Sequence, residues 1–443
     1  MRNRIWLAIG IAALALAGCN DPQDSVTAEQ TFGPSPALPA PQHSWIPTVN
    51  FANAVGWPAN AKPIAAHGMA VNAFATGLNH PRSLYVLPNG DVLVAETDAP
   101  PRPDDVRGIK GWIAKMIMSR AGSGSNSANR ITLLRDTDGD GVADTRSVLL
   151  ENLNSPFGIA LVGADLYVAD TDAIMRFPYH DGDTRIDVAG VKLAELPAGT
   201  INHHWTKDLT ASPDGSKLYA TVGSNSNVGE NGIAAETNRA AVLEIDRDSG
   251  ASRVFASGLR NPNGPSWQPQ SGALWVAVNE RDELGNDLVP DYMTSVRDGG
   301  FYGWPYSYFG QHLDSRVEPQ RPDLVAKAIA PDYALGAHTA SLGLTFNTGR
   351  LFPPEMAGGA FVGQHGSWNR KPRSGYKVIF VPFVDGMPAG KPQDVLTGFL
   401  NKEGEAQGRP VGVKIDKQGA LLVADDVGGT IWRVTPAAKS AAR

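Results

Sequence analysis

The sequence contains a single cysteine, Cys19, among its 443 residues. An internal disulfide framework, a cysteine-ligated zinc site and dithiol redox chemistry are therefore excluded. Charged residues make up only 19% of the chain and the net charge is −6, without a basic stripe, so we expect no nucleic-acid surface. The H-E-x-x-H, P-loop and G-x-S-x-G motifs are also missing, as is the alternation of helices and strands that a dinucleotide fold needs. Metalloprotease, phosphoryl-transfer and serine-hydrolase chemistry thus have no obvious residues to carry them.

The first residues have the pattern of a targeting signal. Arg2 and Arg4 precede an apolar stretch at 5–17, and small residues lead up to Cys19. This stretch is too short for a membrane-spanning helix and resembles a bacterial lipobox. We predict a lipoprotein signal peptide at 1–18, lipid on the Cys19 sulfur, and a periplasmic protein anchored to a membrane; the alternative is an ordinary signal peptide.

The rest of the chain reads as one folded domain with two flexible ends. Residues 19–44 are polar and rich in Pro, Ser and Gln, which predicts a lipidated tether. We place the folded domain at 45–436 and a disordered tail at 437–443. Within the domain, the segment Gly108–Arg120 alone has helical spacing, which predicts a short helical insertion in a loop, with a membrane or partner contact as the alternative.

The 48 glycines and 33 prolines mark many turns, and six apolar runs follow turn signals along the chain. Most runs are also preceded by another extended stretch, so each belongs to a hairpin unit. A hairpin unit that recurs in this way indicates a radial array of β-sheets, whose loops carry the chemistry. The runs are Asp91–Ala95, Ala164–Ala169, Lys217–Val222, Ala273–Val278, Ala360–Gly363 and Ala420–Ala424.

Unusual polar residues stand where several of these hairpins begin or end. His204 precedes the third hairpin, and a histidine in such a loop can act as a general base, although a structural or metal-binding role is the alternative. Equivalent loops of a radial array converge on one end of its channel, where guanidinium groups could bind an anionic ligand. Independent surface charges are the alternative. The cationic candidates at such positions are Arg260, Arg370, Lys371 and Arg409.

Together these segments resemble a known family. The motifs HHW-x6-SPDG, GLRNPNG, NERDELG, DGGFYGWP and SWNR-x-P-x-SGYKV are similar to those of the soluble pyrroloquinoline-quinone (PQQ) glucose and aldose dehydrogenases. The similarity is greater still to the L-sorbosone dehydrogenase-like branch, and it covers roughly residues 73–435.

The resemblance implies an all-β fold, a six-bladed β-propeller that holds PQQ at one end of its channel. It also implies that the main chain of Glu280 and Arg281 binds the calcium ion that holds PQQ. Gln407 departs from the family pattern, because glucose-oxidising members carry an arginine there, which puts glucose specificity in doubt. The further implied roles are a general base at His204, quinone contacts at Arg260 and Asn261, and cofactor contacts at Arg370 or Lys371 and at Arg409.

One acidic segment stands apart from the hairpin ends. Its D-x-D-x-D-G spacing lets several oxygens converge on one calcium ion, although Ser147 stands where an EF-hand loop would have glutamate. A solvated acidic hairpin tip is the alternative. The four predicted ligands are Asp136, Asp138, Asp140 and Asp144.

We therefore expect a quinoprotein that oxidises a sugar, a polyol or a sugar-derived aldehyde by hydride transfer to PQQ. The expected partners are this small substrate and a cytochrome or quinone electron acceptor. Two other functions stay open: a calcium-dependent lactonase on the same scaffold, and a lipoprotein that binds a partner without catalysis.

Overall fold

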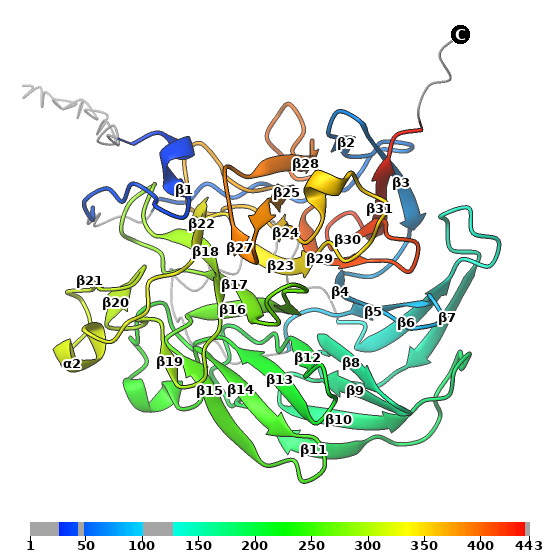
Figure 1. Cartoon of the computed structure of the whole chain (residues 1–443), viewed down its shortest axis with the longest axis horizontal. Coiled ribbons are helices and arrows are strands. Elements are labelled where there is room, and N and C mark those ends of the chain that lie inside the picture. The colour runs from blue at the N-terminus through cyan, green and yellow to red at the C-terminus, as the bar shows by residue number, and fades with distance from the viewer. Residues whose placement is uncertain (1–25, 43–47, 101–126, 439–443) are drawn as a thin grey trace, which may run out of the picture.

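The computed structural model describes residues 26–42, 48–100 and 127–438. Six sheets of four or five strands surround a central axis, which confirms the predicted all-β, six-bladed propeller (Figure 1). The described α-helical structure is one short segment, α2 (Pro322–Val325). None of the helices in these ranges has the length and apolar character to cross a membrane.

Each of the first three blades is an antiparallel sheet whose strands follow the chain from the axis outward. Blade 1 consists of β4 (Pro81–Val86), β5 (Val92–Glu96), β6 (Arg130–Arg135) and β7 (Thr145–Leu150). Blade 2 consists of β8 (Gly158–Val162), β9 (Asp165–Ala169), β10 (Ala173–Pro178) and β11 (Val191–Glu195). Blade 3 consists of β12 (Leu209–Ala211), β13 (Lys217–Val222), β14 (Ala241–Asp246), β15 (Ser252–Ser257) and the short parallel strand β19 (Gly300–Phe301).

The other three blades repeat this order, and two of them gain a short outer strand from the N-terminal segment. Blade 4 consists of β16 (Asn261–Trp267), β17 (Leu274–Asn279), β18 (Pro290–Ser295), β22 (Tyr333–Ala337) and β1 (Phe32–Gly33). Blade 5 consists of β23 (Ser341–Phe346), β24 (Ala360–Gln364), β25 (Lys377–Val381), β28 (Gln393–Thr397) and β2 (Ile64–Ala65). Blade 6 consists of β29 (Pro410–Ile415), β30 (Leu421–Asp425), β31 (Thr430–Pro436) and β3 (Met69–Ala75).

Small elements lie in the loops between these strands. Two hairpins and three 3-10 turns complete the described structure. They are β20 (Ser307–Tyr308) with β21 (His312–Leu313), β26 (Phe383–Val384) with β27 (Met387–Pro388), η1 (Ala28–Thr31), η2 (Ile233–Glu236) and η3 (Pro354–Met356).

The ring closes through a strand pair from the two ends of the domain. β3 pairs antiparallel with β31, so the N-terminal strand completes the last blade. Around the axis, the innermost strands β4, β8, β12, β16, β23 and β29 contact one another in sequence, and β29 contacts β4 again. A closed ring leaves only short, protected sheet edges, which is the usual solution to exposed strands in propellers.

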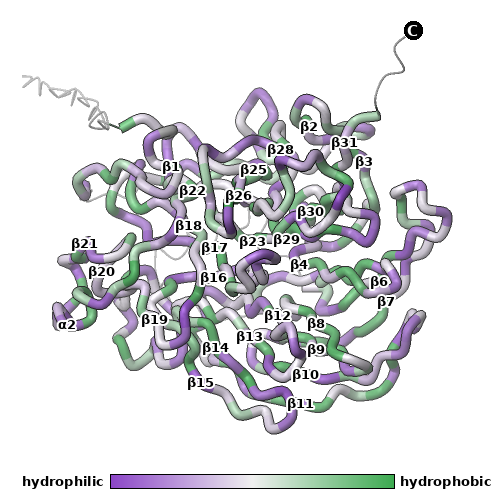
Figure 2. The backbone as a smooth tube through the Cα atoms, in the orientation of Figure 1, coloured by the Kyte–Doolittle hydropathy of each residue, from purple (hydrophilic) through white to green (hydrophobic). Residues whose placement is uncertain are grey.

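The six predicted apolar runs are the second strands of the six blades, each confirmed to within one residue at either end. Both faces of such a strand pack against a neighbouring blade, so its residues are buried without alternation. The core is accordingly divided among six main hydrophobic clusters, one at each interface between blades. Figure 2 shows the hydrophobic stretches along the strands and the hydrophilic ones in the turns.

The N-terminal segment differs from the predicted tether. Phe32 and Gly33 pair with β22. The Phe32 ring packs directly onto Gly336, because a Cβ atom added to Gly336 would stand only 2.6 Å from the ring. An aromatic ring can dock here because Gly336 has no side chain. The polar composition of 19–44 did not reveal this contact. The predicted signal peptide, Cys19 and the helical insertion at Gly108–Arg120 lie outside the described residues.

Candidate active site

One end of the propeller, which we name the site face, collects the polar residues that the sequence analysis placed at the ends of the hairpins. In every blade the start of the inner strand pairs with the end of the second strand; for example, Asn261 faces Asn279 and Pro410 faces Asp425. Loops that precede inner strands and loops that follow second strands therefore lie at the same end. His204, Arg260, Glu280 and Arg409 all belong to such loops.

His204 is held as a neutral base. Its Nδ1 lies 2.8 Å from the Ser224 carbonyl oxygen and 3.1 Å from the Ser224 hydroxyl. Because a carbonyl oxygen only accepts, Nδ1 carries the hydrogen and Nε2 carries the lone pair. Burial, together with the positive charge of Arg260, lowers the pKa of His204 well below the ordinary histidine value. The ring is therefore unprotonated near neutral pH and able to take a proton at Nε2.

Lys207 fixes the loop that carries this histidine. Its side chain is fully buried, and Nζ donates to the Trp205 carbonyl at 3.2 Å. Burial and the charge of Arg239 lower the pKa of Lys207 well below its usual value. The Trp205 carbonyl also accepts from the Thr171 hydroxyl at 2.8 Å, so blades 2 and 3 hold the loop together.

Arg260 and Asn261 lie beside His204, as predicted. Ser224 connects His204 and Arg260: its carbonyl oxygen binds the histidine, and its backbone N–H donates to the Arg260 carbonyl at 2.8 Å. The buried Arg260 guanidinium donates to the Glu280 carbonyl at 2.7 Å and to the Asn227 side chain at 3.1 Å. The side-chain oxygen of Asn261 is buried and has no hydrogen-bond partner.

Gly223 permits this close approach of blades 3 and 4. A Cβ on Gly223 would stand 2.4 Å from both the Asn261 side-chain oxygen and the His204 Cβ. We expect Gly223→Ala to displace His204 and to lower kcat/KM at least about ten-fold, because small misplacements of catalytic groups are costly. Steady-state kinetics measure the change in kcat/KM, and circular dichroism shows whether the variant keeps its fold. Gly272→Ala is the control, since no heavy atom lies within 4 Å of its Cβ position; equal activity of the two variants would contradict the expectation.

Asp282 was not predicted, although it belongs to one of the motifs quoted above. Its carboxylate lies 3.3 Å from Nδ1 of His338 and 3.8 Å from Arg260, and it accepts from the Asn369 amide at 2.8 Å. Burial opposes ionisation, but His338 and Arg260 together lower the pKa of Asp282 to about 2. A carboxylate therefore sits between blades 4 and 5, next to the predicted quinone contact.

A second carboxylate, Asp426, was also missed and organises the opposite side of the ring. It accepts from Arg82 at 2.6 Å and contacts Nε2 of His365 at 2.9 Å. Burial raises the pKa of Asp426, but the interactions with His365 and Arg82 outweigh burial and hold that pKa well below its usual range. Arg82 also lies 5.8 Å from the Trp205 ring. A signal in the sequence was available, because Arg82 is the second residue of the first inner strand and Arg260 directly precedes the fourth.

Arg409 joins this second group. The side chain is buried, stacks 5.2 Å from the Tyr376 ring and donates to the Ala52 carbonyl at 3.1 Å, while its Nε has no partner. Its charge acts on His365, and burial lowers the pKa of that histidine to about 4. The structure thus brings His204, Arg260 and Asn261 together around Gly223 and Ser224, and it places Arg409 in the separate group around Asp426 and His365.

The other predicted residues lie farther from His204. The Arg370 guanidinium pairs with Asp287 and donates to the Asn286 carbonyl at 3.0 Å, whereas Lys371 is exposed. The Glu280 carbonyl accepts from Arg260, so calcium at this oxygen would replace that hydrogen bond. The Arg281 side chain is buried against Asp314 and the Asp282 carbonyl.

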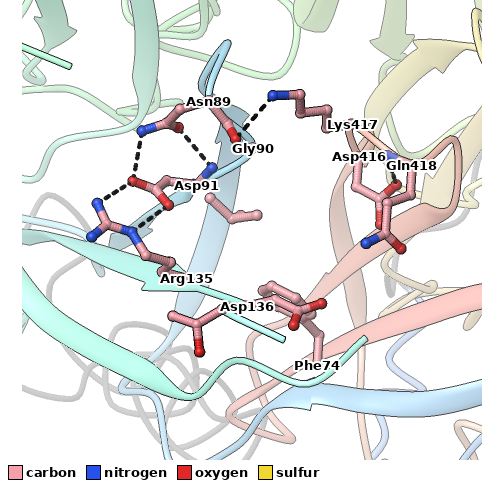
Figure 3. Close-up of a pocket in the computed structure, with 11 residues that line it drawn as sticks. Phe74, Asn89, Gly90, Asp91, Arg135, Asp136, Asp416, Lys417 and Gln418 are labelled. Carbon is pink, nitrogen blue, oxygen red and sulfur yellow. Dashed lines mark hydrogen bonds and ion pairs between the residues drawn. The ribbon is translucent and has the colours of Figure 1, made fainter. Parts of the chain in front are cut away.

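The acidic segment lies at the opposite end of the propeller. Oxygens of Asp136, Asp138 and Asp144 lie within 4.8 Å of one another, while Asp140 lies outside this group and accepts from the Val142 amide at 2.8 Å. Beside the segment is a cavity of about 390 Å³ (Figure 3). Its side chains are already paired; for example, Arg135 binds both oxygens of Asp91 at 2.8 and 2.6 Å. We place no chemistry in this cavity.

Two family models match the chain. The model described as Domain of unknown function (DUF7133) matches residues 88–367, which is more than half of the chain. The chain belongs to the DUF7133 family. A second model, TrAA12-like, matches residues 318–437 of this DUF7133 protein.

Curated relatives of the DUF7133 protein include named quinoproteins. It is 28% identical over 297 residues to an uncharacterized protein of Borreliella burgdorferi, covering 65% of this chain and 77% of that one. It is 22% identical over 431 residues to the PQQ-dependent pyranose dehydrogenase of Coprinopsis cinerea, covering 83% of this chain and 54% of that one. The PQQ-dependent sugar dehydrogenase of Hypocrea jecorina is 21% identical over 421 residues, covering 84% and 88%.

Solved structures show the same fold. The PQQ domain of the Coprinopsis cinerea pyranose dehydrogenase, in its holo form, superposes with a TM-score of 0.69 at 20% identity, covering 87% of this chain and all of that domain. The calcium structure of the Trichoderma reesei AA12 enzyme gives 0.69 at 18% identity, with 88% and 99% covered. The DUF7133 protein therefore has the propeller of the PQQ-dependent sugar dehydrogenases, and these similarities do not single out the L-sorbosone branch.

Proposed function

We propose that the protein is a PQQ-dependent dehydrogenase that oxidises a sugar, a polyol or a sugar-derived aldehyde, with His204 as the general base. The observation that carries this proposal is the geometry around His204. A neutral imidazole with a fixed tautomer stands beside the Arg260 guanidinium and the unpaired Asn261 oxygen on the site face. Similarity to PQQ-dependent sugar dehydrogenases supports the choice of cofactor.

The residues of the site face suit a polar, polyanionic heteroaromatic group. Several of their buried polar atoms lack a hydrogen-bond partner, which is unusual in a native protein and is expected where a bound group completes the set. Arg260 and Asn261 would hold the quinone end, and Arg409, with Arg370 or Lys371, would meet the carboxylates. PQQ bound here would supply a quinone that accepts two electrons as a hydride, and the Glu280 and Arg281 carbonyls would hold the calcium ion that polarises the quinone. The unpaired atoms are Arg82 Nε, Asn225 Oδ1, Asn261 Oδ1, Asn369 Oδ1 and Arg409 Nε.

The protein's own residues would move the proton and stabilise charge. Nε2 of His204 takes the proton of the substrate hydroxyl, which for an aldehyde is a hydroxyl of its hydrate, while Nδ1 keeps its hydrogen bond to Ser224. The Ser224 carbonyl oxygen then stabilises the imidazolium that forms on His204. Arg260 lies where it can stabilise negative charge that develops on oxygen during the oxidation.

Reconstitution tests the proposal. Purified protein is mixed with PQQ and Ca²⁺, and reduction of an electron-accepting dye is followed with a panel of pyranoses, polyols and L-sorbosone. We expect turnover only when both additions are present. Hydrolysis of lactones without PQQ would support the lactonase alternative instead, and an absence of both activities would support a binding function. Oxidation of L-sorbosone in preference to the pyranoses would place the protein in the sorbosone branch.

We also propose that the protein is exported and attached to a bacterial membrane through lipid on Cys19, and that a cytochrome or membrane quinone takes its electrons. The lipobox-like sequence supports this. Cys19→Ala should move the protein from the membrane fraction to the soluble periplasmic fraction without changing dye reduction. Membrane association of the Cys19→Ala variant would contradict it.

We propose, finally, that Asp136, Asp138 and Asp144 form a structural calcium loop at the far end of the propeller, without the fourth predicted ligand, Asp140. Calcium that binds only the folded state raises stability by about 2.7 kcal/mol at a concentration of 100 Kd. Differential scanning calorimetry should therefore show a rise in Tm with Ca²⁺ that Asp138→Asn largely removes. Asp385→Asn, in an exposed turn elsewhere, is the control. The same rise in all variants would place the calcium effect at another site.

A further inference from the structure

A cavity of about 510 Å³ lies between the outer strands of blades 1 and 2, and its lining includes none of the residues described above around His204, around Asp426 or in the acidic segment. Its walls come from β7 with the residues after it, from β10, and from the loop that precedes β11. Most of the residues in these walls have apolar side chains. The apolar lining includes Leu150, Leu153, Met175, Phe177, Ile186 and Val188.

One carboxylate is set among these apolar walls. Asp170 follows the last residue of β9, lines the cavity and is only 6% exposed. Its Oδ1 is buried without a hydrogen-bond partner. Asp282 and Asp426 on the site face differ in this respect, because each of them is paired with cationic groups.

The burial of Asp170 makes its ionised form less stable, as its pKa shows. Burial raises its pKa to about 7, and the charge of the neighbouring Asp172 adds to the rise. A carboxylate in apolar surroundings gains most from a cation that enters with it, since the pair neutralises a charge that water no longer solvates.

The charges at the rim favour the same kind of ligand. Glu151 and Asp187 are exposed there, and both contact Arg185, at 3.0 and 2.5 Å. Three carboxylates, counting Asp170, thus face a single guanidinium in the lining. The remaining negative charge attracts cations and disfavours anions.

We propose that this cavity is a binding site for a small organic cation, namely a primary amine with a short apolar chain. The ammonium group pairs with the Asp170 carboxylate, and the chain lies against Leu150, Met175 and Phe177. The cavity has the size that is usual for small-molecule sites, with one buried polar group that fixes orientation. An aromatic wall at Phe177 also suits a cation.

Three probes of equal length and different charge test the proposal: hexylamine, hexanol and hexanoate, titrated into the full chain by isothermal calorimetry. We expect hexylamine to bind at least about ten-fold more tightly than hexanol, and hexanoate more weakly than either. Asp170→Asn keeps the shape of the side chain and removes the charge, so it should bring hexylamine to the affinity of hexanol. Asp385→Asn makes the same chemical change in an exposed turn outside the cavity, so it is the matched control and should change hexylamine binding less than about two-fold.

Equal affinity for the amine and the alcohol in the unaltered protein would overturn the proposal, as would the absence of measurable binding. Hexylamine affinity that survives Asp170→Asn would also overturn it. Because binding is read directly, these results do not depend on PQQ or on dehydrogenase activity. Thermal unfolding of both variants without probe shows that each is folded. Asp170→Asn should not lower Tm, since the asparagine oxygen can still accept from the Asn154 amide and the substitution removes the charge of a buried carboxylate whose other oxygen has no partner.

Discussion

His204→Ala is expected to lower kcat by about 10²- to 10⁴-fold, which is the usual contribution of a general base. The reason is specific: Nδ1 is committed to the Ser224 carbonyl, so Nε2 is the proton acceptor that the variant loses. Stopped-flow measurement of cofactor reduction isolates this step from dye reduction. Titration of PQQ into the variant should show nearly unchanged binding, because Arg260, Asn261 and Arg409 are left in place.

The pH profile gives an independent check on the same residue. Burial and Arg260 lower the pKa of His204, so the acid limb of kcat/KM should fall at a pH below the ordinary histidine value of 6.5. Activity then persists into mild acid and is lost only as His204 becomes protonated. His180→Ala, in an exposed turn of blade 2, is the control histidine and should leave rate and profile unchanged. A wild-type kcat for His204→Ala would remove the proposed base.

Asp426→Asn is expected to lower the free energy of unfolding by about 3 kcal/mol, the scale of breaking a buried ion pair. The change leaves the Arg82 guanidinium in the ring without the carboxylate that it binds at 2.6 Å. Urea denaturation measures the loss as a lower midpoint at an unchanged m-value.

The sign of the pH dependence follows from the lowered pKa of Asp426. Its stabilisation is present above the pKa of an unfolded aspartate, about 3.9, and disappears as the pH falls through the lower folded value. The difference between Asp426→Asn and the unaltered protein should therefore be constant from pH 5 to 8 and shrink in stronger acid. Asp385→Asn should stay within about 0.5 kcal/mol of the unaltered protein. A full effect in Asp385→Asn, or none in Asp426→Asn, would contradict the role of this pair.

The fold could be predicted from the sequence because every second strand of a blade is buried on both faces. Such a strand leaves a continuous apolar run after a turn, and Lys217–Val222 was placed without error. The contact of Phe32 with Gly336 could not be predicted in this way, because it depends on one aromatic ring and one missing side chain far away in the chain.

The candidate site was only partly predictable for a related reason. His204, Arg260 and Asn261 stand in unusual short motifs, so they could be selected before any contact was known. Asp282 and Asp426 are ordinary in the sequence, and their importance comes from what surrounds them: His338 and Asn369 for one, Arg82 and His365 for the other. Arg370 shows the opposite case, since its motif is distinctive while its guanidinium pairs with Asp287.

The pairing of β3 with β31 also makes the site depend on both ends of the folded domain. Removal of residues 430–436 would leave β3 without a partner strand and β30 with an open edge. Asp426 directly follows β30 and binds Arg82 of blade 1. A variant without these residues would therefore keep His204 and Arg260 but lose the support of the contact that joins blades 6 and 1.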